Sequence, residues 1–473
     1  MRRRLLAFAA VALAALAVVA VVLTRGGDEE TRSPRADPRA EALAYAPRNA
    51  TAIVGVNTAT PVAGLIVPEL VPRLTNGALR AAEVQPLLGN EAVVALFDTS
   101  ARRGQLSVVA RDADALRALG RRLRRAGSYR GAALYAGPEG SAIAIRGATL
   151  VAAPDEPTVR RALDVRADPR AHLTEAQFDE RLAGLPRTAP VRAVFDAKAV
   201  VASRLDGVHR TRWGRSLGNG AAVLLSAEGA LRMPFRLQTD AGRVTNADLP
   251  LATGTRPPQM RGSAPLLIGV RDLRRPIAFL RRIDPERFGA IDSLQTDLPA
   301  FLRLDVDGLI GGLSGDATIS SRDLLEHVVV RTDPRDPEAF RAPLQRLSTI
   351  SGVLQRLGVD NIELDEEPGD AYRLRVDGRL ALRAGVFGRT LVATNDERAG
   401  LRAAAAQPPA AAPPGAAGAL TVRIQARTAR RILMTTFGLP PEAGLIVDRL
   451  GDLTAWARAE RDAVSGELRL AVR

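Results

Sequence analysis

Arginine clusters are the feature of this sequence that most suggests binding chemistry. One cluster lies in a predicted helix, DADALRALGRRLRRAG at 112–127, and the other surrounds a tryptophan in HRTRWGR at 209–215. Because a guanidinium group binds phosphate in a forked geometry, both predict contact with an anionic lipid or an acidic wall polymer. Solvated helix faces in an arginine-rich protein look the same, so both interpretations stay open. The predicted binding residues are Arg117, Arg121, Arg122, Arg124, Arg125, Arg210, Arg212, Trp213 and Arg215.

Two further charged segments allow weaker predictions. The segment RDLRRPIAFLRR at 271–282 is a third basic stretch of the same character. The densest acidic run, ELDEEPGD at 363–370, predicts a solvated loop, with a weak cation site as the alternative.

The residue types that carry most enzyme chemistry are missing or scattered. The chain has no cysteine, which excludes disulfides, thiolate nucleophiles and thiolate metal sites. The histidines are His172, His209 and His327, and they lack the spacing of a metal motif. Phosphate-binding patterns such as GxGxxG do not occur. We therefore predict no catalytic residues, no metal ligands, no cofactor and no enzymatic activity.

The overall charge does not indicate a nucleic-acid partner. The chain of 473 residues has a formal net charge of +14, and all of its 66 basic residues except Lys198 are arginines. Such a bias is typical of a GC-rich bacterial genome. Aromatic residues make up only 4% of the chain, so there is little surface on which bases could stack.

The first residues have the composition of a membrane signal-anchor. Arg2, Arg3 and Arg4 precede an uncharged and mostly apolar run from Leu5 to Thr24, which as a helix would be about 30 Å long. The sequence predicts a transmembrane helix over 1–24 with a cytoplasmic N-terminus, which would place the bulk of the chain outside the cytoplasm. The alternative is cleavage near Ala17, which would give a secreted protein.

The rest of the chain repeats itself. The segment GATLVAAPDEPTVRRAL at 147–163 resembles GRTLVATNDERAGLRAA at 388–404. In the same order, segments at 51–57, 106–119 and 190–197 match those at 265–271, 327–340 and 419–426. We predict a flexible stalk over 25–45 and a tandem duplication. The two repeat domains are expected at 46–242 and 264–473, joined by a linker at 243–263.

The pattern within each repeat predicts an α+β fold. Tyr372, Leu374 and Val376 alternate with charged residues, which is typical of a strand with one polar face, and Asp377-Gly378 is a hairpin turn. Leucines at helical spacing in 112–127 predict an amphipathic helix. The fold class expected from the sequence is an N-terminal transmembrane helix followed by two homologous domains, each an antiparallel sheet with helices packed on one face.

Several of these segments together resemble a known family. The N-terminal segment followed by ALAYAPRNATAIVGVN, then LLGNEAVVALF and GATLVAAPDEPTVRRAL, is similar to the bacterial family called domain of unknown function 3352. The resemblance covers most of the chain after the stalk. It implies an exported, membrane-anchored protein of repeated α+β architecture, and no site residues.

The function expected from the sequence is a non-catalytic binding or scaffold component of the bacterial cell envelope. Its expected partners are the membrane, an anionic lipid or wall polymer, or an envelope protein. One alternative is a carrier or sensor of an apolar ligand such as lipid, which needs an apolar cavity between sheet and helices. A second is a carboxylate-based hydrolase, which needs two carboxylates in one cleft.

Overall fold

The computed structural model describes residues 38–472, except 61–70, 73–75, 78, 89, 100–102, 228, 287, 289–304, 324–326, 346–361 and 438–449. Among these residues, none of the helices combines the length and the apolar character needed to cross a membrane. This finding does not support a transmembrane signal-anchor, and that prediction is corrected accordingly. The segment for which the anchor was predicted, 1–24, lies outside the described residues.

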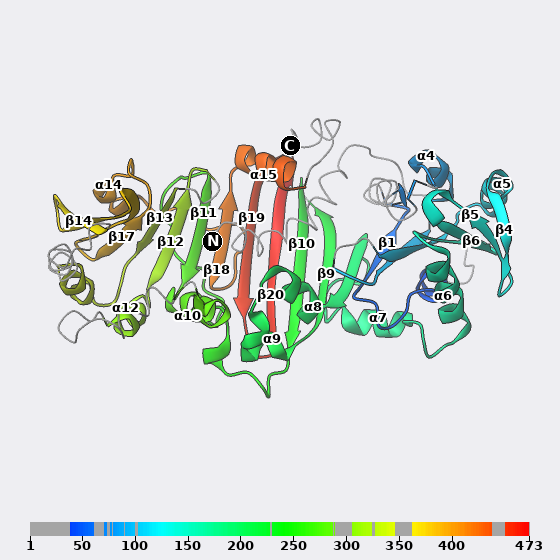
Figure 1. Ribbon diagram of the computed structural model, residues 1–473, viewed down its shortest axis with the longest axis horizontal. Coiled ribbons are helices and arrows are strands. Elements are labelled where there is room, and N and C mark those ends of the chain that lie inside the picture. The colour runs from blue at the N-terminus through cyan, green and yellow to red at the C-terminus, as the bar shows by residue number, and fades with distance from the viewer. Residues whose placement is uncertain are drawn as a thin grey trace.

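All twenty described strands belong to one antiparallel sheet (Figure 1). Read across the sheet from one edge to the other, their pairing order is β4-β5-β6-β7-β3-β2-β1-β8-β9-β10-β20-β19-β18-β11-β12-β13-β17-β16-β15-β14. The strands of the first half are β1 (Ala52–Asn57), β2 (Glu91–Leu96), β3 (Gly104–Val109), β4 (Arg124–Tyr129), β5 (Ala132–Ala136), β6 (Ala142–Arg146), β7 (Thr149–Ala153), β8 (Val191–Asp196), β9 (Leu217–Ala227) and β10 (Ala230–Thr239). Those of the second half are β11 (Leu266–Arg271), β12 (Asp316–Ser321), β13 (Val328–Thr332), β14 (Ile362–Glu367), β15 (Ala371–Val376), β16 (Arg379–Phe387), β17 (Thr390–Thr394), β18 (Leu420–Ile424), β19 (Leu450–Ala459) and β20 (Ala463–Val472).

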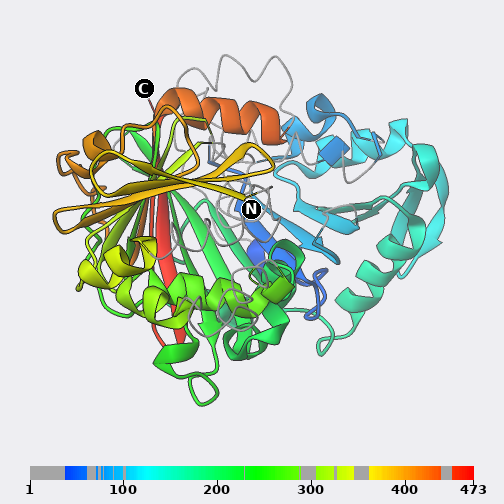
Figure 2. The same cartoon turned by 60° about the vertical axis from the view of Figure 1, so that its left-hand side comes forward.

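The helices connect and cover these strands. The α-helices with both ends among the described residues include α2 (Pro38–Leu43), α4 (Ala81–Val84), α5 (Ala113–Arg122), α6 (Glu156–Ala167), α7 (Glu175–Arg181), α8 (Ala197–Arg204), α9 (Arg212–Ser216), α10 (Arg274–Ile283), α12 (Val306–Gly312), α14 (Leu401–Ala405) and α15 (Ala426–Phe437). Short 3₁₀ turns are η1 (Gln85–Leu87), η2 (Pro138–Gly140), η3 (Val208–Arg210) and η4 (Asn246–Asp248). In Figure 2 the orange helix α15 crosses one end of the strands, and green helices lie at the other end.

The two halves of the sheet have the same strand order. Strands β1 to β10 pair with one another as β11 to β20 do, and the repeated sequence segments fall on equivalent strands. Gly55 of β1 pairs with Val93 of β2, for example, and Gly269 of β11 pairs with Thr318 of β12. The equivalence extends to isolated bridges, since Pro47 pairs with His172 in one half and Arg261 with Pro409 in the other.

The halves are joined through the pair β10·β20, so the prediction of two separate sheets is wrong. These strands pair antiparallel from Ala230 opposite Ala471 to Gln238 opposite Ala463, at the centre of the sheet (Figure 1). Each half, taken alone, would end in a ten-residue strand with unpaired backbone N–H and C=O groups. Pairing the two edges satisfies these groups, which explains why the halves form one sheet.

Helices cover both faces of the sheet in the first half, whereas the sequence predicted one covered face. In β2, Ala92 and Val94 pack into a cluster with Leu116 and Leu119 of α5. On the opposite face, Val93 and Ala95 pack against α2 and α7 in a different cluster, whose members include Leu43 and Phe178. A strand buried on both faces needs a continuous apolar run, and β2 has one.

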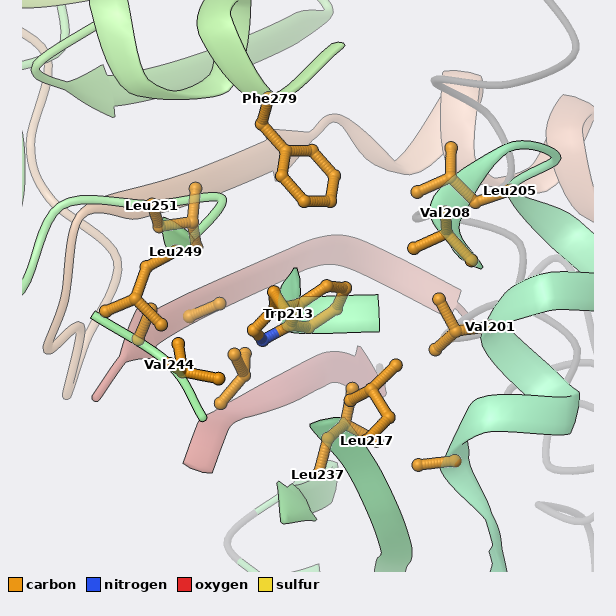
Figure 3. Close-up of a cluster of buried hydrophobic side chains, with 14 of the residues drawn as sticks. Val201, Leu205, Val208, Trp213, Leu217, Leu237, Val244, Leu249, Leu251 and Phe279 are labelled. Atoms are coloured by element: carbon orange, nitrogen blue, oxygen red, sulfur yellow. The ribbon is translucent and has the colours of Figure 1, made fainter. Parts of the chain in front are cut away.

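A third cluster ties the two halves together (Figure 3). At its centre Trp213 of α9 is fully buried, and its ring meets that of Phe279 of α10 edge to face at 5.6 Å between centroids. The cluster also contains Leu249 and Leu251, which lie in the segment predicted as a linker, and Ala457 of β19. That segment is therefore a packed part of the core rather than a loose connection.

Two local predictions also differ from the structure. The helix expected over 112–127 ends at Arg122, and β4 begins at Arg124 because this segment pairs with β5. The acidic run at 363–370 was expected to be a loop. Most of it forms β14, which pairs with β15 from Ile362 to Glu367.

Candidate anion-binding site

A cavity of about 630 Å³ lies where β13 ends and β12 and β17 begin, a volume in the range of small-ligand sites. Its wall contains five arginines and a single carboxylate, that of Asp333. The lining residues are Arg261, Arg274, Ser314, Gly315, Arg331, Asp333, Pro334, Arg335, Arg389 and Thr390. We refer to it as the arginine cavity.

Arg331 forms the fixed base of the arginine cavity. Its side chain is only 8% exposed, and its Nη2 lies 3.1 Å from Asp333 Oδ1 and donates to Thr390 Oγ1 at 3.2 Å. Its Nε donates to the carbonyl oxygen of Ala405 at 3.2 Å. Burial of the guanidinium, together with the neighbouring charge of Arg261, holds the pKa of Arg331 below its usual value, although Asp333 opposes this shift. A further negative charge beside Arg331 would therefore be stabilised.

The other four arginines differ in how far their charges are balanced. Arg274 is matched by Asp272, which accepts from its Nη2 at 2.7 Å, and this hydrogen bond raises the pKa of Arg274. The side chain of Arg261 makes a long hydrogen bond of 3.5 Å to the carbonyl oxygen of Gln407, while its backbone N–H donates to Thr318 Oγ1 at 3.0 Å. Arg335 and Arg389 are exposed, and neither has an acidic partner among the described residues. The arginine cavity thus carries an excess of positive charge that a ligand could neutralise.

The arginine cavity is specific to the second half of the molecule. Arg331 pairs with Thr318 and Val392, and the residue that pairs in the same way with Val93 and Val151 in the first half is Ser107. Ser107 is fully buried and donates to the carbonyl oxygen of Ala42 in α2. Only one of the five arginines has a basic equivalent in the first half. The residues equivalent to Arg261, Arg274, Arg331, Arg335 and Arg389 are, in the same order, Pro47, Thr60, Ser107, Arg111 and Ala148.

The sheet beside the arginine cavity is more polar than its counterpart in the first half. The strand positions occupied by Val93 and Ala95 in the first half carry Thr318 and Ser320 in the second. Thr421 of β18 is fully buried, and its Oγ1 has no hydrogen-bond partner among the described residues. These buried residues are not among those that line the arginine cavity; Thr318, for example, accepts a hydrogen bond from the backbone N–H of Arg261 at 3.0 Å, which helps to position that arginine.

The first cluster of predicted binding residues lies far from the arginine cavity in the strand order, at the β4 edge of the sheet. Arg117, Arg121 and Arg122 extend from α5, whereas Arg124 and Arg125 belong to β4. All five side chains are exposed. Arg117 pairs with Asp114 and Arg122 with Glu83, so part of the expected charge is balanced locally.

The second predicted cluster is not a single surface. Trp213 is fully buried between the two halves, so it is not available to an anionic surface. Arg210, Arg212 and Arg215 are exposed on η3 and α9. Arg215 Nη1 donates to the carbonyl oxygens of His209 at 3.3 Å and Arg210 at 3.0 Å, which ties it to its own turn.

The segment GRSLG at 214–218 matches the GxSxG pattern of hydrolase nucleophiles. In such enzymes the serine stands on a turn from a strand into a helix. Here the order is reversed, because Ser216 ends α9 and β9 follows it. Ser216 is buried, and its Oγ donates to the carbonyl oxygen of Trp213 at 2.7 Å. This serine therefore stabilises a helix end.

The sequence pointed to only one residue of the arginine cavity, Arg274, within the basic stretch at 271–282. Arg261, Arg331, Arg335 and Arg389 are separated along the chain and form no cluster in the sequence. A position-by-position comparison of the two halves carries the missing signal, since four of the five arginines replace a non-basic residue. Among the described residues, no group of His, Asp and Glu side chains is arranged to hold a metal ion.

Comparison with known proteins provides little further information. No family model matches the chain, so the resemblance to domain of unknown function 3352 stays a prediction. No curated protein matches it either. Solved structures of TP0453 align with low similarity: crystal form III has a TM-score of 0.30 and 12% identity, covering 43% of this chain and 82% of that one. Crystal form I has a TM-score of 0.30 and 14% identity, covering 43% and 80% of the two chains.

Proposed function

We propose that this chain is a non-catalytic binding component of the bacterial cell envelope, and that the arginine cavity binds an anionic group of its ligand. The observation that carries the proposal is the presence of five arginines and one carboxylate around a cavity of about 630 Å³. Guanidinium groups bind both phosphoryl and carboxylate oxygens in a forked geometry, so the ligand class is defined by its charge.

The placement in the envelope is supported by the N-terminal sequence. Basic residues followed by an apolar run, as in residues 2–24, are typical of an export signal. The absence of cysteine is compatible with a location on either side of the membrane, so it does not conflict with this placement.

The alternatives have less support from the described residues. A carrier of apolar ligands needs an apolar cavity, and the arginine cavity is lined by charged and polar side chains. A carboxylate-based hydrolase needs two carboxylates in one cleft, and Asp333 is the single acid on this wall, where it accepts a hydrogen bond from Thr390 at 2.7 Å.

We expect Arg335→Gln and Arg389→Gln to weaken anion binding about tenfold each, since a hydrogen bond to a charged group contributes roughly 1.5–3 kcal/mol. The measurement is isothermal titration calorimetry of the full chain at low salt. Pyrophosphate and citrate serve as probes, so that phosphoryl and carboxylate ligands are distinguished. Both residues are exposed and have no acidic partner among the described residues, so neither substitution should affect folding.

The matched control is Arg111→Gln, the equivalent of Arg335 in the first half, which should leave the affinity unchanged. The proposal would be contradicted if the unmodified chain bound neither anion, or if the control weakened binding as much as Arg335→Gln.

A further inference from the structure

The sheet ends in two open edges. β4 pairs with β5 and β14 pairs with β15, and no described strand pairs with the other side of either. The two edges lie at opposite ends of the molecule (Figure 1). A strand at an open edge presents backbone N–H and C=O groups to which another strand can add.

The two edges carry opposite charges. On β4, Arg124 and Arg125 are exposed and have no acidic partner among the described residues. On β14, the exposed side chains of Glu363, Asp365 and Glu366 likewise have no basic partner in the described part of the chain. Glu367 is different, because Arg383 Nη2 lies 2.7 Å from its Oε2 and Arg373 also pairs with it.

The fold already contains an example of the contact that these edges could make. β10 and β20 are equivalent strands of the two halves, and they pair antiparallel at the centre of the sheet. β4 and β14 are also equivalent strands, since each begins the meander that leads to β7 or β17. An antiparallel pair between β4 of one copy and β14 of the next would repeat this relationship between molecules.

We propose that copies of this chain associate head to tail through β4 and β14, which extends the sheet from one molecule to the next. In one antiparallel register, which overlaps the strands over five residues, Arg124 lies opposite Glu366 and Arg125 opposite Asp365. Opposite charges at such positions stabilise a strand pair, whereas like charges destabilise it. Two antiparallel β14 edges would place Glu363 opposite Glu366, and two β4 edges would bring together two basic strands with no acid on either, so only the unlike pair gains opposite charges at facing positions.

The geometry also limits the strength and the form of the association. A β-bulge between Arg125 and Gly127 interrupts the regular edge of β4, so the contact is short and weak. Because the two surfaces are different, the contact does not close into a symmetric dimer and can continue as a chain of molecules.

The test is sedimentation velocity of the full chain over a range of concentrations. A non-ionic detergent, the same in every sample, prevents association through the apolar segment 5–24. At about 50 mM salt we expect the sedimentation coefficient to rise with concentration without stopping at a dimer, and at about 500 mM salt to fall to that of the monomer. Both Arg124→Glu/Arg125→Glu and Asp365→Arg/Glu366→Arg should abolish the rise, with at least about tenfold weaker association.

A mixture of these two variants is the decisive sample. One has two acidic edges and the other two basic edges, so the mixture should associate again although each variant alone does not. The control is Arg170→Glu/Arg204→Glu, which makes the same charge change at exposed positions outside β4 and β14. A single monomeric species for the unmodified chain, or a mixture that stays monomeric, would overturn the proposal. Anion binding by the arginine cavity should be unchanged in all of these variants, so this proposal and the proposed function fail separately.

Discussion

Replacing Trp213 with alanine should lower the free energy of unfolding by about 3–5 kcal/mol, the usual cost of removing a large buried aromatic side chain. Trp213 is fully buried and packs edge to face against Phe279, in the cluster that contains residues of both halves (Figure 3). Within the described part of the chain its indole Nε1 has no hydrogen-bond partner, so the stabilisation comes from packing. Urea unfolding followed by circular dichroism measures the effect without relying on tryptophan fluorescence.

Two further variants sharpen this prediction. Trp213→Phe keeps an aromatic ring and loses no hydrogen bond, so it should cost less than half as much as the alanine variant. Trp456→Ala changes the other tryptophan, which is only half-buried on β19, and serves as the matched control. Equal losses for Trp213→Ala and Trp456→Ala would contradict the expectation that the buried cluster around Trp213 contributes more to stability than a half-buried position on β19.

Replacing Glu91 with alanine should also cost about 3–5 kcal/mol of unfolding free energy, because it leaves the charge of Arg192 buried without its acidic partner, with a hydrogen bond to the carbonyl oxygen of Arg187 remaining. The side chains of Arg192 and Glu91 are only 6% and 8% exposed, and the two form an ion pair. They lie over Gly55, where a Cβ atom would come 3.1 Å from Glu91 Oε1. The measurement is the same urea titration.

The double substitution Glu91→Leu/Arg192→Met tests the cause. With both charges removed and the volume kept, stability should return close to that of the unmodified chain. The control is Asp316→Ala at the equivalent position of the second half. Its partner Arg256 is 67% exposed, so we expect a loss of only about 1 kcal/mol. A double variant as unstable as Glu91→Ala alone would contradict the explanation by an unpaired buried charge.

The strands of the fold were largely predictable because their side-chain patterns are local. The repeated segments at 51–57 and 265–271, for example, fall on β1 and β11. The burial of both faces could also have been inferred from the continuous apolar run AVVAL in β2. The joining of the halves could not, because no local pattern indicates that β10 will pair with β20 across the chain.

The errors at individual residues have the same origin. A helical pattern continues past Arg122, but pairing with β5 begins at Arg124 and overrides it. Trp213 was predicted at the surface because arginines flank it, yet the contact with Phe279 is made across the two halves. The arginine cavity was missed because its residues come together only after β12, β13 and β17 have paired.

The pairing of β10 with β20 has a consequence for the synthesis of the chain. The first half can complete its own strands as soon as Thr239 has been made, but the partner for β10 begins only at Ala463, roughly 220 residues later. At a translation rate of about 5–20 residues per second, the edge of β10 stays unpaired for about 10–50 s before β20 has been made. During that time a ten-residue strand offers its backbone to other nascent chains. A chaperone that binds this edge would favour correct pairing of β10 with β20. Slow synthesis of the second half would favour aggregation instead.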